Sequence, residues 1–280
     1  MTVSSEYKEI LIEIANRVQI PLIKEIVVPT IDEKAKKSNF AAVILEDNSI
    51  GIFFLSLTRE VKKQILKIDS KEYKDISPMD LVKNFTSNNL YKKSLSMGAI
   101  NAISQFIFKK TNFSFDHTSD SLGLLNIYEK DIVGMVGFFP PLVKKIEERG
   151  NKLVIIELKE DLVKKEKNWV VTLDPTNLED CNKVLLTSTT ILNDTIDDIL
   201  KFCSNAERTS VIGPTAGFLP DPLFKRGINV VGGTRIINAK GFLHNIRNNI
   251  RWGSTAKKYT IEREKYAGYA ELLKKIPNEK

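Results

Sequence analysis

A block of hydroxyl side chains between a buried strand and a helix is the stretch of this sequence best suited to bind a ligand. The block spans residues 187–190 (Thr-Ser-Thr-Thr) and follows the apolar run Val184 to Leu186, which predicts a buried strand. Asn193 or Asp194 then precedes an amphipathic segment and could cap its helix. In an open parallel sheet, ligands bind in the loop that leaves a strand at its carboxyl end. The alternative is that these hydroxyls only satisfy neighbouring backbone groups.

Three further turns in the C-terminal half contain glycines at the ends of predicted strands. Glycine lets a ligand approach the backbone closely, and free N–H groups at helix starts favour anions. If the strands are parallel, all four loops open on one edge of the sheet, and we expect a ligand cleft there. The turns are Gly137-Phe138-Phe139-Pro140 after Ile132–Val136, residues 213–217 after Thr209–Ile212, and Gly232-Gly233 after Ile228–Val231.

Glu157 raises a second hypothesis, nucleotide binding. It ends the predicted strand Leu153–Ile156, about 20 residues beyond Gly137, where an acidic residue binds ribose in dinucleotide folds. However, Gly134 to Gly137 lacks the spacing of the G-x-G-x-x-G fingerprint, and the sequence has no G-x-x-x-x-G-K-[ST] phosphate loop. A solvated acid at a strand end is the alternative interpretation of Glu157.

Soft metal ligands are scarce in the sequence. His117 and His244 are isolated, and Cys181 and Cys203 have no C-x-x-C neighbour, so no structural zinc site is predicted. Carboxylate, amide and hydroxyl oxygens remain as candidate metal ligands. The sequence is therefore compatible with a divalent metal ion, held by these oxygens, as a cofactor. No nucleophile-elbow motif is present, and a hydrolytic triad therefore has no support.

The composition is that of a globular protein without a membrane span. The chain has 280 residues, enough for one large or two ordinary domains, and no apolar run is long enough to cross a membrane. Its first residues do not resemble a secretory signal, and two cysteines do not suggest a disulfide framework. We therefore expect a cytoplasmic protein. The formal charge of +7 is spread widely and would not repel an anionic ligand.

Before residue 120, predicted strands are followed by helices, which favours an α+β domain. Ser4 or Ser5 is the candidate cap of a first helix, which Pro21 ends. Asn88 or Asn89 is the candidate cap of a long helix through Lys109. The other expected elements are the helix Ser4–Gln19, strands at Glu25–Val28, Phe40–Leu45 and Ile50–Leu57, and a helix at Met79–Phe85.

After residue 131, strands and helices alternate, which predicts a parallel, Rossmann-like sheet. Helices are expected at Leu142–Arg149 and Asp221–Lys225, and a further short strand at Trp169–Leu173. Residues 111–130 form the expected linker, and residues 241–280 are expected to be mostly helical. The predicted fold class is α/β, with a smaller α+β domain over residues 1–120 and a Rossmann-like domain over residues 131–280.

The C-terminal tail is basic. Arg247, Arg251, Lys257 and Lys258 lie around Trp252, a composition that could contact nucleic acid. The tail contains no recognised nucleic-acid module, so a solvated helix, or one that faces another copy in a homo-oligomer, is favoured over a nucleic-acid partner.

Several motifs taken together resemble the heavy-metal-chelation family, whose members pair a domain similar to the N-terminal domain of enolase with a Rossmann-like domain. The resemblance covers nearly the whole chain. They are VGMVGFFPPLVKKI, VIIEL, LLTSTTILNDTID, VIGPTAGFLPDPLFKRGINVVGGT and the earlier SLSMGAINAIS. The resemblance implies a site in a cleft between the two domains and leaves a chelatase-like enzymatic activity open.

The resemblance also implies which residues form the cleft. Asn101 would approach from the N-terminal domain, unless it only makes a hydrogen bond inside a helix packing. Asp194 stands where glycine is frequent in the family, and would add a carboxylate at the helix start or improve its capping. The Rossmann-like domain would contribute Gly137, Phe138, Pro140, Thr189, Thr190, Asn193, Thr195, Gly213, Pro214 and Thr215, beside Glu157, Thr187, Gly232 and Gly233 from the loops described above.

Three functions follow from these observations. The first is binding of a metal, or of a small molecule that carries a metal, in the cleft; a metal within a ligand, or held by oxygens, suits these residue types better than a thiolate site. The second is a nucleotide-binding or nucleotide-dependent enzyme. The third is a non-catalytic small-molecule binder. In each case the expected partner is a small-molecule or metal ligand.

Overall fold

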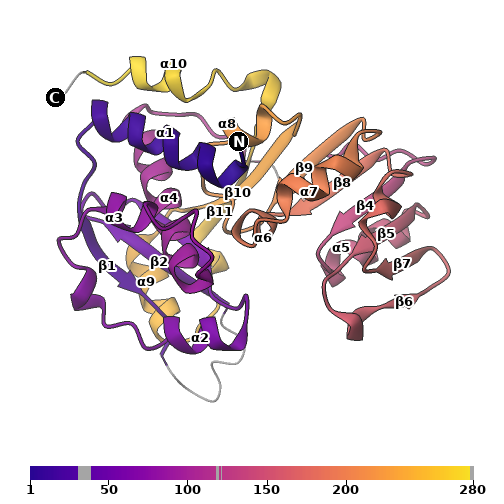
Figure 1. The fold of residues 1–280 in the computed structure, drawn as a ribbon, viewed down its shortest axis with the longest axis horizontal. Helices are drawn as coiled ribbons and strands as arrows, with labels where there is room; N and C mark the ends of the chain where they lie inside the picture. The colour runs from indigo at the N-terminus through magenta and orange to yellow at the C-terminus, as the bar shows by residue number, and fades with distance from the viewer. Residues whose placement is uncertain (31–38, 118–119, 121, 278–280) are drawn as a thin grey trace.

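The computed structural model describes residues 1–30, 39–117, 120 and 122–277, and shows two β-sheets of different kinds. The small sheet has three antiparallel strands in the order β1-β2-β3, formed by Ile23–Val27, Phe40–Leu45 and Ile50–Phe54. The large sheet has eight strands in the order β11-β10-β9-β8-β4-β5-β7-β6. Figure 1 shows the small sheet and its helices packed beside the β10–β11 end of the large sheet.

The helices of the N-terminal part cover the small sheet. Thr2, and neither predicted serine, caps α1 by accepting from the backbone N–H of Ser5 (3.2 Å), while Asn89 caps α4 as expected. The helix α2 was not predicted, because only Val61 and Ile65 are buried in it and its sequence therefore shows little periodicity. The helices are α1 (Val3–Arg17), α2 (Arg59–Ile65), α3 (Pro78–Val82) and α4 (Leu90–Lys110), with a 3₁₀ turn at Ser70–Tyr73.

The long helix α4 lies between the small sheet and the C-terminal half. Its glycine and alanine positions allow close approach, since a Cβ atom on Gly51 of β3 would lie 2.0 Å from the carbonyl oxygen of Gly98. On another side, Gln105 donates to the carbonyl of Gly217 (2.8 Å). Nearly all of α4 is consequently buried, and one apolar cluster runs from the small sheet through α4 to the large sheet.

Six strands of the large sheet are parallel, and its two edge strands are antiparallel. The chain moves from β4 to β5 in one direction and later places β8 on the other side of β4, which creates a topological switch point between β4 and β8. The strands are β4 (Ile132–Val136), β5 (Lys152–Ile156), β6 (Lys164–Lys165), β7 (Trp169–Thr172), β8 (Lys183–Thr187), β9 (Arg208–Ile212), β10 (Val230–Ile236) and β11 (Ala256–Glu262).

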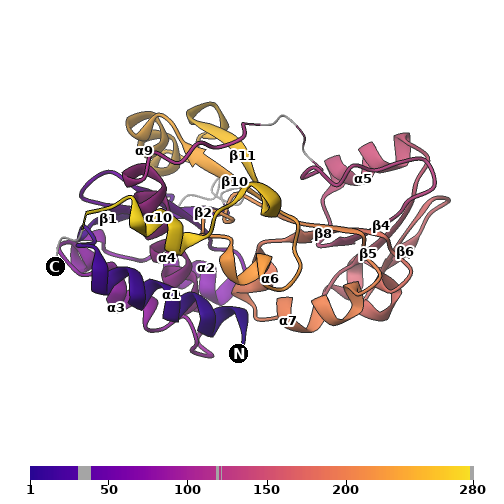
Figure 2. The same ribbon diagram turned by 90° about the horizontal axis from the view of Figure 1, so that it is seen from above.

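Short helices cover both faces of this sheet. Figure 2 shows α5 on one face and α6 and α7 on the opposite face. Two helices of the C-terminal part lie elsewhere: α9 packs against the small sheet, where Phe242 and Ile246 join its apolar cluster, and α10 contacts α4. The helices of the C-terminal part are α5 (Pro140–Glu148), α6 (Thr189–Leu192), α7 (Ile196–Ile199), α8 (Asp221–Phe224), α9 (Ala239–Arg247) and α10 (Tyr269–Lys274), with 3₁₀ turns at Glu160–Leu162, Pro175–Leu178, Leu200–Cys203, Gly253–Thr255 and Arg263–Lys265. The mostly parallel sheet confirms the predicted α/β class.

Two expectations about the C-terminal part were wrong. Gly232 and Gly233 lie inside β10, which continues to Ile236 because β11 pairs with it over its whole length. The tail is accordingly not mostly helical, since β11 occupies Ala256–Glu262. Tyr259, Thr260 and Ile261 are buried in succession, so this strand lacks the alternation of buried and exposed residues that marks a strand in a sequence.

The predicted linker packs against the large sheet in its described parts. The backbone N–H of Thr260 donates to the carbonyl of Asp116 (2.8 Å), and Leu125 is fully buried. Residues 118, 119 and 121 of the linker lie outside the described residues. The division at residues 120 and 131 therefore stays a prediction. Within the described ranges, no helix is both long and apolar enough to cross a membrane.

Candidate functional site

A cavity of about 300 Å³ lies at the carboxyl ends of β4, β5 and β8, beside the switch point of the sheet. We call it the threonine pocket. Its described lining residues all fall between positions 136 and 202. They include seven residues that the sequence analysis selected, which are Gly137, Glu157, Thr187, Thr189, Thr190, Asn193 and Thr195, together with Asp198 and an apolar wall. Parallel packing of β4, β5 and β8 brings these separate loops together.

The hydroxyl groups of the pocket differ in how they are used. Those of Thr187 and Thr189 share one hydrogen bond (2.9 Å), which leaves one hydroxyl hydrogen of the pair for a ligand. The Thr190 hydroxyl instead donates to the carbonyl of Thr187 (2.7 Å), and this residue is only 2% exposed. Thr190 therefore holds the loop, and Thr187 and Thr189 offer hydrogen-bonding groups to the cavity.

Replacement of Thr190 tests this distinction. Thr190→Val should lower the free energy of unfolding by about 1 kcal/mol, because it leaves the part-buried carbonyl of Thr187 without this partner. Thr189→Val is the matched control and should cost less, since its hydroxyl bonds to another hydroxyl at a half-buried position. Urea denaturation of both variants measures the difference. Equal stability of the two variants would contradict this assignment.

A left-handed residue divides the predicted helix after the hydroxyl block. Asp194 has φ 58°, so α6 ends and α7 begins separately. Thr195, and neither predicted residue, occupies the N-cap position of α7, where it makes no side-chain capping bond. The Asn193 amide satisfies its surroundings when Nδ2 faces the loop. In this orientation it donates to the carbonyl of Thr190 (3.0 Å) and to the Thr195 hydroxyl (2.8 Å). The Thr195 hydroxyl then keeps its hydrogen for a ligand.

The loop between α6 and α7 is held by the N-terminal part of the chain. Asp194 forms an ion pair with Lys93 of α4, whose side chain is fully buried, and accepts from the Ser4 hydroxyl (2.7 Å). Asp197 accepts from the backbone N–H of Val3 (2.9 Å) and from Nε of Arg226 (2.9 Å). The carboxylate expected at the helix start thus neither caps α7 nor lines the pocket.

Glu157 lies in the pocket, but its carboxylate is bound to backbone. One oxygen accepts from the N–H of Phe138 (2.5 Å) and the other from the N–H of Leu158 (3.2 Å). A ribose would compete with both bonds. Pro140 and Pro141 begin α5 and have no N–H, so this helix lacks donors that bind pyrophosphate in dinucleotide folds. These contacts disfavour the nucleotide hypothesis.

The remaining predicted residues do not line the threonine pocket. Phe138 packs near Trp169, with ring centroids 6.0 Å apart, and Pro140 belongs to the first turn of α5. A second cavity of about 280 Å³ is lined by Gly213, Pro214, Gly232 and Gly233, among others. The four predicted loops therefore serve two cavities and not a single cleft.

Asn101 and Thr215 are buried between the two parts of the chain. Asn101 donates to the carbonyls of Ile52 (2.7 Å) and Thr215 (2.9 Å), and it lines neither cavity. The Thr215 hydroxyl bonds to that of Ser188 (2.6 Å). The two hydrogen bonds of Asn101 match the packing role that was the alternative interpretation for this residue.

Most residues in the apolar wall of the pocket were not predicted from the sequence. Leu173 directly follows β7 and Leu158 is the second residue after β5, so their positions after predicted strands were the signal that could have identified them. The other missed residues are Val136, Ile156, Pro175, Asp198, Ile199 and Phe202.

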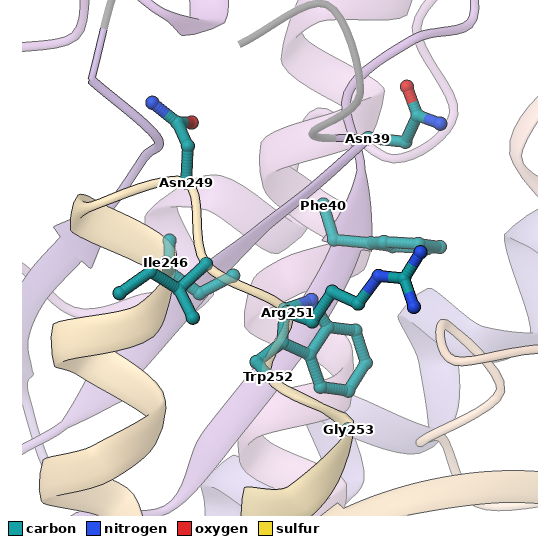
Figure 3. Close-up of a pocket in the computed structure, with 8 residues that line it drawn as sticks. Asn39, Phe40, Ile246, Asn249, Arg251, Trp252 and Gly253 are labelled. Carbon is teal, nitrogen blue, oxygen red and sulfur yellow. The ribbon is translucent and has the colours of Figure 1, made fainter. Parts of the chain in front are cut away.

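A third cavity, about 620 Å³, lies away from the sheet edge, next to α9. Figure 3 shows Arg251 and Trp252 beside Phe40, and the Phe40 and Trp252 rings meet edge to face with centroids 5.7 Å apart. Its described lining includes Arg251 and Trp252 of the basic tail and none of the residues predicted for the ligand cleft. The cavity adjoins Asn39, at the border of the described ranges, and we assign it no role.

Comparison with known proteins identifies the family. The model of the DUF364 family, described as "Putative heavy-metal chelation", matches residues 120–265, which is more than half of the chain and contains the whole threonine pocket. The chain belongs to this family. The resemblance inferred from the sequence motifs is thereby confirmed.

Three proteins similar to this DUF364 protein are one curated relative and two solved structures. An uncharacterised protein from Methanocaldococcus jannaschii is 28% identical over 182 residues, which cover 64% of this chain and 69% of that protein. A DUF364 structure from Desulfitobacterium hafniense has a TM-score of 0.68 at 19% identity and covers 92% of this chain and 98% of its own. A DUF364 structure from Pyrococcus horikoshii has a TM-score of 0.65 at 17% identity, with 93% and 100% covered. These two structures share the fold.

The donor groups of this DUF364 chain do not fit a soft heavy metal. Among the residues described by the structure, no group of three or more His, Cys, Asp and Glu side chains is placed to hold a metal ion. Both cysteines are buried, and burial raises the pKa of Cys181 to about 11 and that of Cys203 to about 12. Their thiols therefore stay protonated at neutral pH, whereas metals bind thiolates.

Proposed function

We propose that this DUF364 protein binds a small organic chelator, free or loaded with its metal, in the threonine pocket. The observation that carries the proposal is the chemistry of the lining: hydroxyl, amide and carboxylate oxygens at one end, and an apolar wall at the other. Such a surface recognises an uncharged or weakly charged organic molecule by hydrogen bonds and apolar contact. A soft metal would then arrive inside its ligand, which reconciles the family description with a chain poor in soft donors.

The hydrogen-bonding inventory of the pocket suits a chelating group. The Thr187–Thr189 pair and Thr195 can each donate one hydrogen, and the Glu157 oxygens can accept further bonds. The neutral, hydroxamic acid form of a hydroxamate carries a carbonyl acceptor and N–H and O–H donors in one compact unit. It is therefore a suitable probe of the proposed function.

Calorimetric titration with hexanohydroxamate tests the proposal. We expect saturable binding that is tighter than binding of hexanamide, which lacks the chelating oxygen. Thr189→Val and Thr195→Val should each weaken hexanohydroxamate binding by about fivefold, the value of one hydrogen bond. Thr86→Val is the matched control, because Thr86 is exposed in the N-terminal part. No binding, or binding unchanged in both pocket variants, would contradict the proposal.

Equilibrium dialysis with nickel distinguishes a metal that binds within its organic ligand from a metal that the protein coordinates directly. We expect the pocket to retain nickel only when hexanohydroxamate is also present. Retention of nickel alone that disappears in Glu157→Gln would instead indicate direct coordination by oxygens of the protein, and would refute delivery of the metal within its ligand.

A further inference from the structure

Two leucines at the threonine pocket are exposed to solvent. Leu158 is 73% exposed and Leu173 is 41% exposed, and both line the pocket. They follow the neighbouring strands β5 and β7, whose register pairs Ile156 with Thr172. The two side chains thus leave the sheet at adjacent places, and the Leu158 backbone is fixed by its hydrogen bond to Glu157.

The polar and apolar ends of the pocket are separated by the order of the strands. The hydroxyl groups follow β8, the leucines follow β5 and β7, and β4 lies between them. Three strand spacings separate β8 from β7, a span of about 14 Å. At the end of β4 stands Gly137, with φ 95°, where a Cβ atom would lie 3.2 Å from Cγ2 of Thr187. Because Gly137 has no side chain, none stands at this position between the hydroxyl end and the leucine end of the pocket.

We infer that the ligand of the threonine pocket is amphipathic, with a hydrogen-bonding group at Thr187, Thr189 and Thr195 and an apolar chain or ring that passes Gly137 and covers Leu158 and Leu173. The inference rests on the proposed function and adds the class of the ligand. Binding of the apolar part removes from water two leucines that the free protein leaves exposed, and Ile199 and Phe202 extend the same apolar wall. Leu158 and Leu173 are therefore specificity-determining residues, which select for the length of the apolar part.

A series of alkyl hydroxamates measures the two ends of the ligand independently. Titration of the full chain with aceto-, butano-, hexano- and octanohydroxamate should show binding that tightens by about three- to fourfold for each added methylene group. In the Leu158→Ser/Leu173→Ser double variant this dependence on chain length should flatten, while binding of acetohydroxamate stays the same. Ile237→Ser is the control, because Ile237 is 54% exposed and lies outside the pocket lining.

The variants distinguish failure of this inference from failure of the proposed function. Thr189→Val should weaken every member of the series by the same factor and leave the chain-length dependence unchanged. A chain-length dependence that is absent from the unmodified protein would overturn the amphipathic ligand even if Thr189→Val weakens binding. A dependence that persists in the double leucine variant would overturn the assignment of Leu158 and Leu173 as the residues that select the apolar part. If the series does not bind at all, both the inference and the proposed function are refuted.

Discussion

Asp194→Asn should lower the free energy of unfolding by about 3 kcal/mol, since it leaves the ammonium group of Lys93 buried without an opposite charge. Lys93 is fully buried in α4, and Asp194 is the carboxylate that pairs with it. Asparagine tolerates the left-handed backbone of this position as aspartate does, so the variant isolates the loss of charge. Urea denaturation of the variant and of the unmodified protein gives the value.

Lys93→Met provides the matched comparison. Methionine retains much of the buried volume and removes the charge, and the Asp194 side chain, at 55% exposed, can then be solvated by water. We expect Lys93→Met to cost about 1 kcal/mol or less, and the double variant to be as stable as Lys93→Met alone. A smaller loss for Asp194→Asn than for Lys93→Met would show that the buried lysine does not depend on this partner.

The Lys93–Asp194 ion pair also positions residues of the threonine pocket. Asp194 joins the loop of Asn193 and Thr195 to α1 and α4, so the N-terminal part positions two pocket residues without lining the pocket. We therefore expect Asp194→Asn to weaken hexanohydroxamate binding as well as stability.

Gly233→Ala should destabilise the protein by about 3 kcal/mol, because the new methyl group has no space. A Cβ atom at Gly233 would lie 2.3 Å from the carbonyl oxygen of Ala216 and 2.5 Å from the hydroxyl of Tyr259. That hydroxyl is itself fixed by hydrogen bonds to Gln105 and Ala216. The glycine thus permits close packing of β10 against its neighbours, whatever binds in the adjacent cavity.

Gly253→Ala is the control for this prediction. A Cβ atom there meets no other atom within 4 Å, and we expect a change in stability within about 0.5 kcal/mol. Thermal unfolding of both variants is sufficient to compare them. A Gly233→Ala variant as stable as Gly253→Ala would return Gly233 to the candidate ligand-binding residues.

Local signals in the sequence were sufficient for most elements of the large sheet. The apolar runs of β4, β5, β8 and β9 predicted buried strands, and the structure contains all four, because a strand buried on both faces is apolar throughout. The Thr-Ser-Thr-Thr block predicted a ligand-binding loop, because polar side chains at the carboxyl edge of a parallel sheet need either a ligand or a local partner. The block lines a cavity, and its binding of a ligand stays a prediction.

The tertiary structure decided which of these residues share a cavity. The order β9-β8-β4-β5-β7 brings Leu173 and Glu157 to the threonines of β8 and leaves Gly213 and Gly233 in another cavity, and nothing in the local sequence sets that order. The left-handed Asp194 and its buried partner Lys93 were equally hidden, since they stand 101 residues apart and their pairing depends on how α4 packs against the sheet. Spacing along the chain determines the elements, whereas long-range packing determines which side chains meet, because contact between distant residues depends on the path of the whole backbone.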